Sequence, residues 1–331
     1  MRFTTQVQLP KGSMHITHST RIMLLGSCFV QNIGERMQGC KLNVDINPYG
    51  ILYNPFSIAK ALERIADGEP FSASSPELFE HNGWWHSIMH HSEFSRKTKE
   101  ETVDAVNSRL MDAHRALPGL DVLMLTFGTA YVYRLADGGS VVGNCHKLPQ
   151  KMFVRELLGV DAIVDGMSAI IEKMLVVRPS LELLFTVSPI RHLRDGAHDN
   201  QISKATLLLA IEELRRRFPQ NACYFPSYEI VLDELRDYRF YADDMVHPST
   251  MAVDYLWQCF SDCYFPDETK RVNAAVGDIM RALAHRPVDP SSPQHKAFLQ
   301  KTVEKMEQLK KDNPHIDFNK EIQQCNILLE R

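Results

Sequence analysis

The stretch Ile22-Met23-Leu24-Leu25-Gly26-Ser27-Cys28-Phe29 carries the clearest structural information in the chain. Four consecutive apolar residues before a glycine are typical of a short buried strand, and the small polar residues that follow suit a turn into a helix. Such a turn lifts the Ser27 side chain out of the sheet, and the free N–H groups of the new helix face any negative charge beside it. The stretch therefore predicts a hydroxyl nucleophile at the end of a first strand. Small residues are also common at this position without a catalytic role.

Outward from this stretch, short apolar runs alternate with longer periods typical of amphipathic helices. Short β-rich runs followed by long helical periods favour parallel strands joined by right-handed crossovers. We therefore predict an α/β fold: a three-layer α/β/α sandwich with a mainly parallel five-stranded sheet. Ligands gather at the carboxyl ends of the strands in such sheets. The predicted strands cover 22–26, 41–45, 122–127, 181–187 and 222–225, and the helices between them cover 30–38, 55–66, 99–115, 161–177 and 203–218.

A second motif lies far downstream, at residues 241–249, where Asp244 and His247 stand three residues apart before an expected helix start. A serine nucleophile needs a base. Histidine serves near neutral pH, and it works best when a carboxylate fixes its tautomer and stabilises the imidazolium. Because this loop follows the last predicted strand, the fold would bring it to the sheet edge that holds Ser27. In the alternative interpretation, Asp244 is a solvated turn residue and residues 247–249 only cap the next helix.

A strand followed by Gly-Ser near the start, combined with a late Asp-x-x-His, resembles the SGNH, or GDSL-type, hydrolase superfamily. More narrowly, Gly26-Ser27-Cys28-Phe29-Val30 is nearly the signature that gives the GSCFA family its name, with valine in place of the final alanine. The resemblance covers roughly residues 20 to 265 and implies ester chemistry without naming a substrate. Four further stretches are similar to that family: Asn47-Pro48-Tyr49-Gly50, His91-Ser92-Glu93-Phe94-Ser95, Asn144-Cys145-His146-Lys147 and Val187-Ser188-Pro189.

The resemblance also implies an oxyanion hole. Its donors are expected to be the backbone N–H groups of Ser27 and of Gly50, although a plain turn glycine explains Gly50 nearly as well. The superfamily usually adds an asparagine after the third strand, where this chain has Phe127-Gly128-Thr129-Ala130. Either Thr129, Asn144 or a neighbouring backbone N–H replaces it, or the site is a weaker catalyst than its relatives.

Two insertions interrupt the alternation of strands and helices. Residues 69–97 carry Trp84-Trp85-His86 and His90-His91, which we expect to form part of the wall of the site, with His91 near the substrate. His86 and His90 have the spacing to share a helix face and bind zinc, but no further ligand at matching spacing is evident, so no metal site is predicted.

The second insertion, near 131–150, contains an Asp-Gly-Gly turn that predicts a β-hairpin. Its polar end is expected to approach the active edge. His192 and His198 follow the fourth predicted strand, where they either touch the substrate or remain solvated loop residues. Arg191 or Arg194 in the same loop would suit a carboxylate or phosphate on a ligand.

Composition limits the functional classes. The chain has 331 residues, 44% of them hydrophobic and 24% charged, with a formal net charge of -4 and no basic patch, which argues against a nucleic-acid partner. The seven cysteines lack paired close spacings apart from Cys259 and Cys263, and several fall in apolar runs, typical of buried thiols. Cys259 and Cys263 lie one helical turn apart, which fits a helix face packed on the core better than a metal pair. No stretch approaches the roughly 20 apolar residues of a membrane span, and the cytoplasm is the expected location unless a signal was removed. No Gly-x-Gly-x-x-Gly follows a predicted strand, and no cofactor is expected.

The pattern changes after residue 265. We predict a hydrolase-like domain over 1–265 and a helical extension over 266–331, with helices at about 267–285, 294–311 and 318–328 separated by a proline-rich break. The extension carries no catalytic constellation. It either packs across the α/β domain or forms an interaction surface, which would allow a homo-oligomer.

Together these features predict a serine esterase that attacks through Ser27, with His247 as general base and Asp244 as the acid that orients it. By resemblance, the substrate would be a short acyl ester, such as an acetyl ester, of a carbohydrate or small metabolite. Two alternatives use the same pocket: an O-acyltransferase with the same triad, and a non-catalytic module that binds a glycan or acyl ligand.

Overall fold

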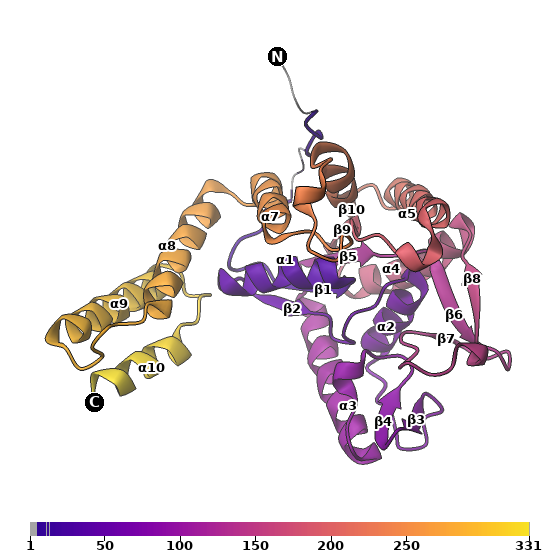
Figure 1. Cartoon of the computed structure of the whole chain (residues 1–331), viewed down its shortest axis with the longest axis horizontal. Helices are drawn as coiled ribbons and strands as arrows, with labels where there is room; N and C mark the ends of the chain where they lie inside the picture. Colours follow the sequence, from indigo (N-terminus) through magenta and orange to yellow (C-terminus); the bar gives the residue numbers. More distant parts are fainter. Residues whose placement is uncertain (1–4, 11, 13, 331) are drawn as a thin grey trace.

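Five parallel strands form the central sheet of the computed structural model, which describes residues 5–10, 12 and 14–330 (Figure 1). The strands follow the order β10-β9-β5-β1-β2. They are β1 (Ile22–Gly26), β2 (Val44–Ile46), β5 (Val122–Phe127), β9 (Glu182–Val187) and β10 (Ala222–Tyr224). The predicted α/β fold with a five-stranded sheet is confirmed, and each predicted strand overlaps an observed one.

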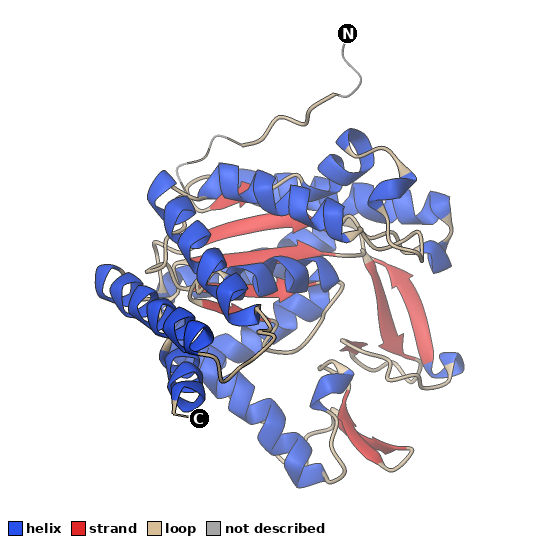
Figure 2. Cartoon of the chain, turned by 60° about the vertical axis from the view of Figure 1, so that its left-hand side comes forward, coloured by secondary structure: helices blue, strands red, loops and turns tan. Residues whose placement is uncertain are grey.

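Helices cover both faces of this sheet, and Figure 2 shows the red strands of the sheet surrounded by blue helices. One face carries α1 (Cys28–Gly39) and α7 (Thr250–Tyr264). The other carries α2 (Pro55–Asp67), α3 (Lys99–Ala116), α4 (Val160–Val177) and α5 (Ala197–Arg217).

The alternation of side chains along β1 explains why both faces need a cover. Leu24 packs with the α1 and α7 layer, whereas Met23 and Leu25 pack with the α2 to α5 layer, and all three are buried. A strand that is apolar on both faces is stable only between two layers of helices. The continuous apolar run before Gly26 therefore specified a central strand.

Two smaller antiparallel sheets come from the predicted insertions. The first is the hairpin of β3 (Leu78–His81) and β4 (Trp84–Ser87). The second contains β6 (Tyr131–Leu135), β7 (Val141–Val142) and β8 (Phe153–Leu157). Pairing of β6 with β7 confirms the predicted hairpin. The third strand, β8, was not predicted; it is mostly exposed, so it lacks a clear burial pattern.

The chain ends in α8 (Asp267–Ala284), α9 (Pro293–Asp312) and α10 (Asn319–Leu329), which project from the sheet region in Figure 1. Their bounds agree with the predicted helices within about one residue. They bury a hydrophobic cluster of their own that includes Val276, Met306 and Phe318. An ion pair between Lys41 and Glu321 joins them to the α/β part. In the described part of the chain, no helix combines the length and apolarity needed to cross a bilayer.

Candidate active site

Ser27 stands at the turn between β1 and α1. It is the N-cap of α1, and its Oγ accepts a hydrogen bond from the backbone N–H of Phe29 at 3.3 Å. Gly26 before it has φ of 148°, and a Cβ there would lie 2.3 Å from the carbonyl oxygen of Thr126 on β5. Only glycine fits this approach, so it fixes where Ser27 leaves the sheet.

Asn47 supports the same turn from the end of β2. Its Oδ1 accepts a hydrogen bond from the Gly26 N–H at 2.9 Å, and its Nδ2 donates to Gln31 Oε1 on α1 at 3.1 Å. The chain then returns beside β1, because the N–H of Leu52 donates to the Gly26 carbonyl at 3.1 Å. The residues that follow Leu52 are thus brought close to Ser27.

The Asp244–His247 loop holds its two side chains together. Nδ1 of His247 lies 2.5 Å from Asp244 Oδ2, while Asp244 Oδ1 accepts the backbone N–H groups of Val246 and His247, both at 2.9 Å. The backbone hydrogen bond from His247, followed by the side-chain bond from its ring and the one from Val246, lowers the pKa of Asp244 to about 2. Asp244 is therefore ionised near neutral pH. The carboxylate that orients a histidine base must be in this state.

A hydrogen bond from Arg191 in the neighbouring loop holds the Asp244–His247 loop in place. Nη2 of Arg191, which follows β9, donates to the carbonyl of Met245 at 2.5 Å. Met245 has φ of 57°, which is uncommon for a residue with a side chain. Within the loop, the N–H of Ala242 donates to the His247 carbonyl at 2.7 Å.

Ser27 and His247 line one pocket of about 490 Å³ at the carboxyl ends of the strands. The predicted residues Thr129, Asn144 and His192 also line it. Within the described chain, no hydrogen bond joins Ser27 to His247. The tyrosines Tyr53, Tyr131 and Tyr133 and the arginines Arg155, Arg191 and Arg194 complete much of the remaining wall.

The prediction for Gly50 does not fit the structure. Its N–H donates to the carbonyl of Asn47 at 2.7 Å, and it does not line the Ser27 pocket. Its φ of 71° and the nearby His91 side chain show a turn glycine packed against another loop. A backbone donor remains at Cys28, which begins α1, because the first N–H groups of a helix have no partner within it.

Two side-chain amides face the pocket in place of the missing asparagine. Asn144 accepts the N–H of His146 at 2.8 Å through Oδ1, and Asn54, the N-cap of α2, accepts the N–H of Ser57 at 2.8 Å. In each case Nδ2 makes no hydrogen bond within the described residues. Asn54 was not predicted. An asparagine before a proline is nevertheless a helix-start signal, and it places Asn54 at the end of the connection that leads into α2.

Thr129 lies in the pocket wall but its hydroxyl is already used. Oγ1 lies 3.1 Å from Ser203 Oγ and accepts the backbone N–H of Tyr131 at 3.1 Å. The backbone N–H of Thr129 donates to the Tyr53 carbonyl at 3.0 Å. Thr129 therefore holds the wall together rather than offering a free donor.

His192 and the buried Lys204 shape the electrostatics behind the pocket. Burial, with added repulsion from Lys204 and Arg155 and then His247, lowers the pKa of His192 to about 4, so its ring is neutral near pH 7. Nζ of Lys204 donates to the carbonyls of Gly128 at 2.6 Å and Ser188 at 2.7 Å. These residues follow β5 and β9, so Lys204 ties together two strand ends that border the site. Sequence patterns gave no signal for this lysine.

The first insertion does not form the predicted wall. Trp84, Trp85, His86 and His91 are absent from the lining of the Ser27 pocket. The hairpin packs on α3 instead, with Lys99 of α3 over the Trp85 ring. His86 and His90 do not share a helix either, because His86 lies on β4 and His90 in the turn after it. Among the residues described, no three His, Cys, Asp or Glu side chains form a metal cluster.

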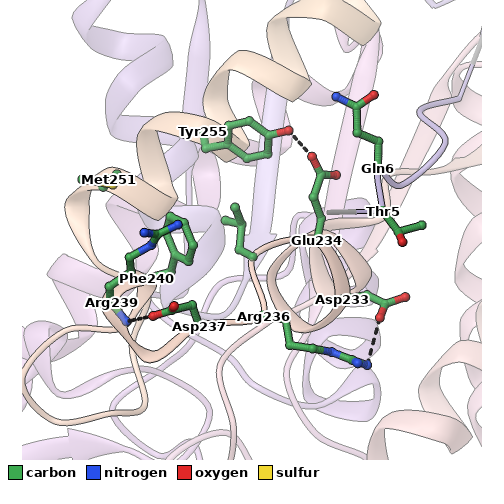
Figure 3. A pocket seen from close by; sticks show the side chains of 11 residues that line it. Thr5, Gln6, Asp233, Glu234, Arg236, Asp237, Arg239, Phe240, Met251 and Tyr255 are labelled. Atoms are coloured by element: carbon green, nitrogen blue, oxygen red, sulfur yellow. Dashed lines mark hydrogen bonds and ion pairs between the residues drawn. The ribbon is translucent and has the colours of Figure 1, made fainter. Parts of the chain in front are cut away.

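A larger pocket, of about 1260 Å³, lies elsewhere and shares no lining residue with the Ser27 pocket. Figure 3 shows that its carboxylates are engaged: Glu234 accepts the Tyr255 hydroxyl, and Asp233 pairs with Arg236. The N–H of Val7 also donates to Glu234. This pocket lies where the N-terminal segment meets α7, and its described lining contains no serine or histidine.

The fold and the site define an α/β protein with a serine and an Asp–His pair at the carboxyl edge of a parallel sheet. The sequence model of the GSCFA family matches residues 21–260, and that of the GSCFA domain protein, C-terminal domain, matches residues 276–331. The chain therefore belongs to the GSCFA family. No curated protein matches the sequence.

Three solved structures are similar over much of the chain. A carbohydrate esterase family 3 protein from Talaromyces cellulolyticus is 9% identical with a TM-score of 0.33, covering 78% of this chain and 99% of that one. An acetyl esterase mutant with acetate ion is 10% identical with a TM-score of 0.35 and the same coverages. A carbohydrate esterase family 2 enzyme with a carbohydrate binding domain, from Corynascus thermopiles (Myceliophthora fergusii), is 14% identical with a TM-score of 0.38, covering 83% and 69%.

Proposed function

We propose that this protein is a serine ester hydrolase of the SGNH type that removes short acyl groups, such as acetyl, from a carbohydrate or small metabolite. One observation carries the proposal. A serine at a strand-to-helix turn and a histidine already paired with a carboxylate come from distant parts of the chain and line the same pocket. These are the nucleophile, base and orienting acid that ester hydrolysis requires.

In the proposed reaction, Ser27 Oγ attacks the ester carbonyl carbon while its proton passes to Nε2 of His247. Asp244 keeps the remaining ring proton on Nδ1 and stabilises the imidazolium. The C–O bond to the alcohol then breaks, and His247 returns the proton to the leaving oxygen. Water attacks the acyl-serine with His247 again as base, which releases the acid and restores Ser27.

The negative charge on the tetrahedral intermediate needs donors. The N–H of Cys28 and the Nδ2 atoms of Asn54 and Asn144 are available at the pocket, and one well-placed donor is worth roughly 3 to 4 kcal/mol of barrier. Of the two amides, Asn54 is the better candidate, because it follows the segment that hydrogen-bonds to Gly26 beside Ser27.

Two features of the pocket favour water as the acceptor of the acyl group and a sugar-like alcohol as the leaving group. The His247 side chain is 48% exposed, so water reaches the base directly, whereas acyl transfer requires water to be excluded. The alcohol portion would rest against Tyr53, Tyr131 and Tyr133, which combine flat apolar surfaces with hydroxyl groups.

A non-catalytic binding module is the second candidate. The absence of a hydrogen bond between Ser27 and His247 in the described chain favours it. Catalytic hydrogen bonds, however, are often long in an unliganded site and shorten only when substrate binds.

Covalent labelling separates the two candidates. The protein is incubated at pH 8 with a fluorophosphonate, and its intact mass is measured. We expect one adduct on the wild type and none on Ser27→Ala, while Ser188→Ala, which removes another serine of the same pocket, still reacts. An unlabelled wild type, or an adduct that persists in Ser27→Ala, would remove the basis of the esterase proposal.

A further inference from the structure

The charge of the Ser27 pocket differs from that of the whole chain. The chain carries a formal net charge of -4, yet the pocket lining includes the three arginines Arg155, Arg191 and Arg194 against a single carboxylate, Asp195. Such a local excess of positive charge, enclosed by low-dielectric walls, attracts anions to a cleft. How much of this charge is free depends on the partners of each arginine.

Arg155 is already neutralised. Its Nη2 lies 2.6 Å from Asp195 Oδ1, and its guanidinium lies 3.3 Å from the centre of the Tyr131 ring. Arg155 and Asp195 thus form a local ion pair that uses the only carboxylate among the described lining residues.

Arg191 has no anionic partner in the described chain. Nη2 donates to the neutral carbonyl of Met245, the guanidinium lies over the ring of Tyr241 at 4.7 Å, and Nε is buried without a hydrogen bond. Neither a carbonyl nor a ring cancels this positive charge, and Arg191 is one of the residues that line the pocket.

Arg194 is freer still. It is exposed, it lines the same pocket, and it makes no hydrogen bond or ion pair with any described residue. Its positive charge acts on the Cys145 thiol and on Asp195, so it lies within electrostatic reach of both residues in the pocket wall. Asp244, which lies outside this lining, is held by His247 and its own loop.

We propose that this pocket selects esters whose alcohol portion carries a carboxylate or a phosphate, bound by Arg194 with support from Arg191. The proposal rests on the proposed function, because an acetyl-sized acyl group leaves room for a charge only on the alcohol side. A planar guanidinium forms paired hydrogen bonds with either anion, and it is weakly hydrated, so it suits a partly enclosed site. The tyrosine walls would hold the ring that carries the anionic group.

The test measures binding rather than turnover, so that it does not depend on catalysis. Calorimetric titrations of Ser27→Ala use three acetylated sugars: neutral acetyl-glucose, acetyl-glucuronic acid and acetyl-glucose 6-phosphate. Because a hydrogen bond to a charged group is worth more than a neutral one, at least one anionic sugar is expected to bind about tenfold more tightly than the neutral sugar. The preferred anion identifies carboxylate or phosphate.

Substitutions at Arg194 then test whether this arginine causes the preference for anionic sugars. Adding Arg194→Ala is expected to reduce the anionic preference about fivefold or more, and Arg194→Glu to abolish it. Arg216→Ala, which removes an exposed arginine from α5, serves as the matched control and should keep the full preference. The proposal is overturned by equal binding of neutral and anionic sugars, by no binding of any of the three, or by a preference that survives Arg194→Glu.

The two proposals fail separately. An anionic preference in a protein that gives no fluorophosphonate adduct would leave the subsite in place and remove the esterase. An adduct on Ser27 with no anionic preference would leave the esterase and remove the subsite.

Discussion

The side chain of Asn47 holds the backbone of Gly26, the residue before the proposed nucleophile, through a 2.9 Å hydrogen bond from the Gly26 N–H to Asn47 Oδ1. Both residues have unusual backbone conformations, with φ of 44° at Asn47 and 148° at Gly26. The position of Ser27 therefore depends on a contact between the ends of β1 and β2.

Replacing Asn47 by alanine should weaken both the fold and the site. The Gly26 N–H would lose its buried acceptor, which costs about 1 to 3 kcal/mol. The free energy of unfolding, measured in urea, is expected to fall by that amount, and the fluorophosphonate labelling rate should fall with it. Asn82→Ala, at an exposed turn with φ of 53° where the side chain contacts only the ring of His81 by a hydrogen bond, controls for the backbone conformation. An equal loss in both variants would contradict a specific role for Asn47.

Replacing Asp244 by asparagine should reduce activity without unfolding the protein. The amide no longer stabilises the imidazolium and favours the wrong ring tautomer, so we expect kcat on 4-nitrophenyl acetate to fall by a factor of about 10² to 10⁴. Asp243→Asn, which changes the neighbouring exposed carboxylate, should keep most of the activity. Because the pKa of Asp244 is about 2, its carboxylate does not titrate in the working range, and the wild-type pH profile should show no inflection from it above about pH 4.

Changing Asn54 to aspartate tests the oxyanion donor. Aspartate keeps the acceptor that caps α2 but removes the amide N–H, so thermal stability should hold while kcat falls about 10²- to 10³-fold. Asn319→Asp, at the exposed start of α10, is the matched control. If Asn54→Asp retains full activity and Asn144→Asp does not, the donor role belongs to Asn144.

Lys204 should make stability depend on pH in a definite direction. Burial lowers its pKa from 10.5 to about 7, and its two carbonyl partners match the two N–H groups of a neutral amine. Between about pH 7 and pH 10 the unfolded chain binds more protons at this lysine, so its contribution to the free energy of unfolding rises with pH. The difference between the wild type and Lys204→Met should therefore grow in favour of the wild type over that range. A pH-independent difference, as expected for the exposed Lys173→Met, would show that Lys204 stays charged in the fold.

Much of the fold could be predicted from the sequence, because burial requires a characteristic local pattern of apolar residues in each strand and helix. The run Ile22–Leu25 is apolar on both faces, and a strand with that pattern must lie between two helical layers. The Asp244 and His247 side chains, three residues apart, are held together by their own loop, so their pairing was also predictable from the sequence.

The remaining features depended on which distant segments meet. The family resemblance implied a donor at Gly50, yet the turn with Asn47 uses its N–H. The tryptophans at 84 and 85 were placed at the site, but their hairpin packs on α3. Asn54 reached the pocket from another segment, and its local pattern predicts only a helix start. Arg194 lines the pocket from the loop where the sequence placed a candidate ligand for an anion.

The sequence by itself determined the strands of the central sheet, the long helices and the two local motifs, since periodicity and loop hydrogen bonds act over a few residues. The tertiary structure decided which side chains share the pocket and what charge it carries. Those properties depend on contacts between segments that are far apart in the sequence. A shift of one loop would bring different side chains into contact there.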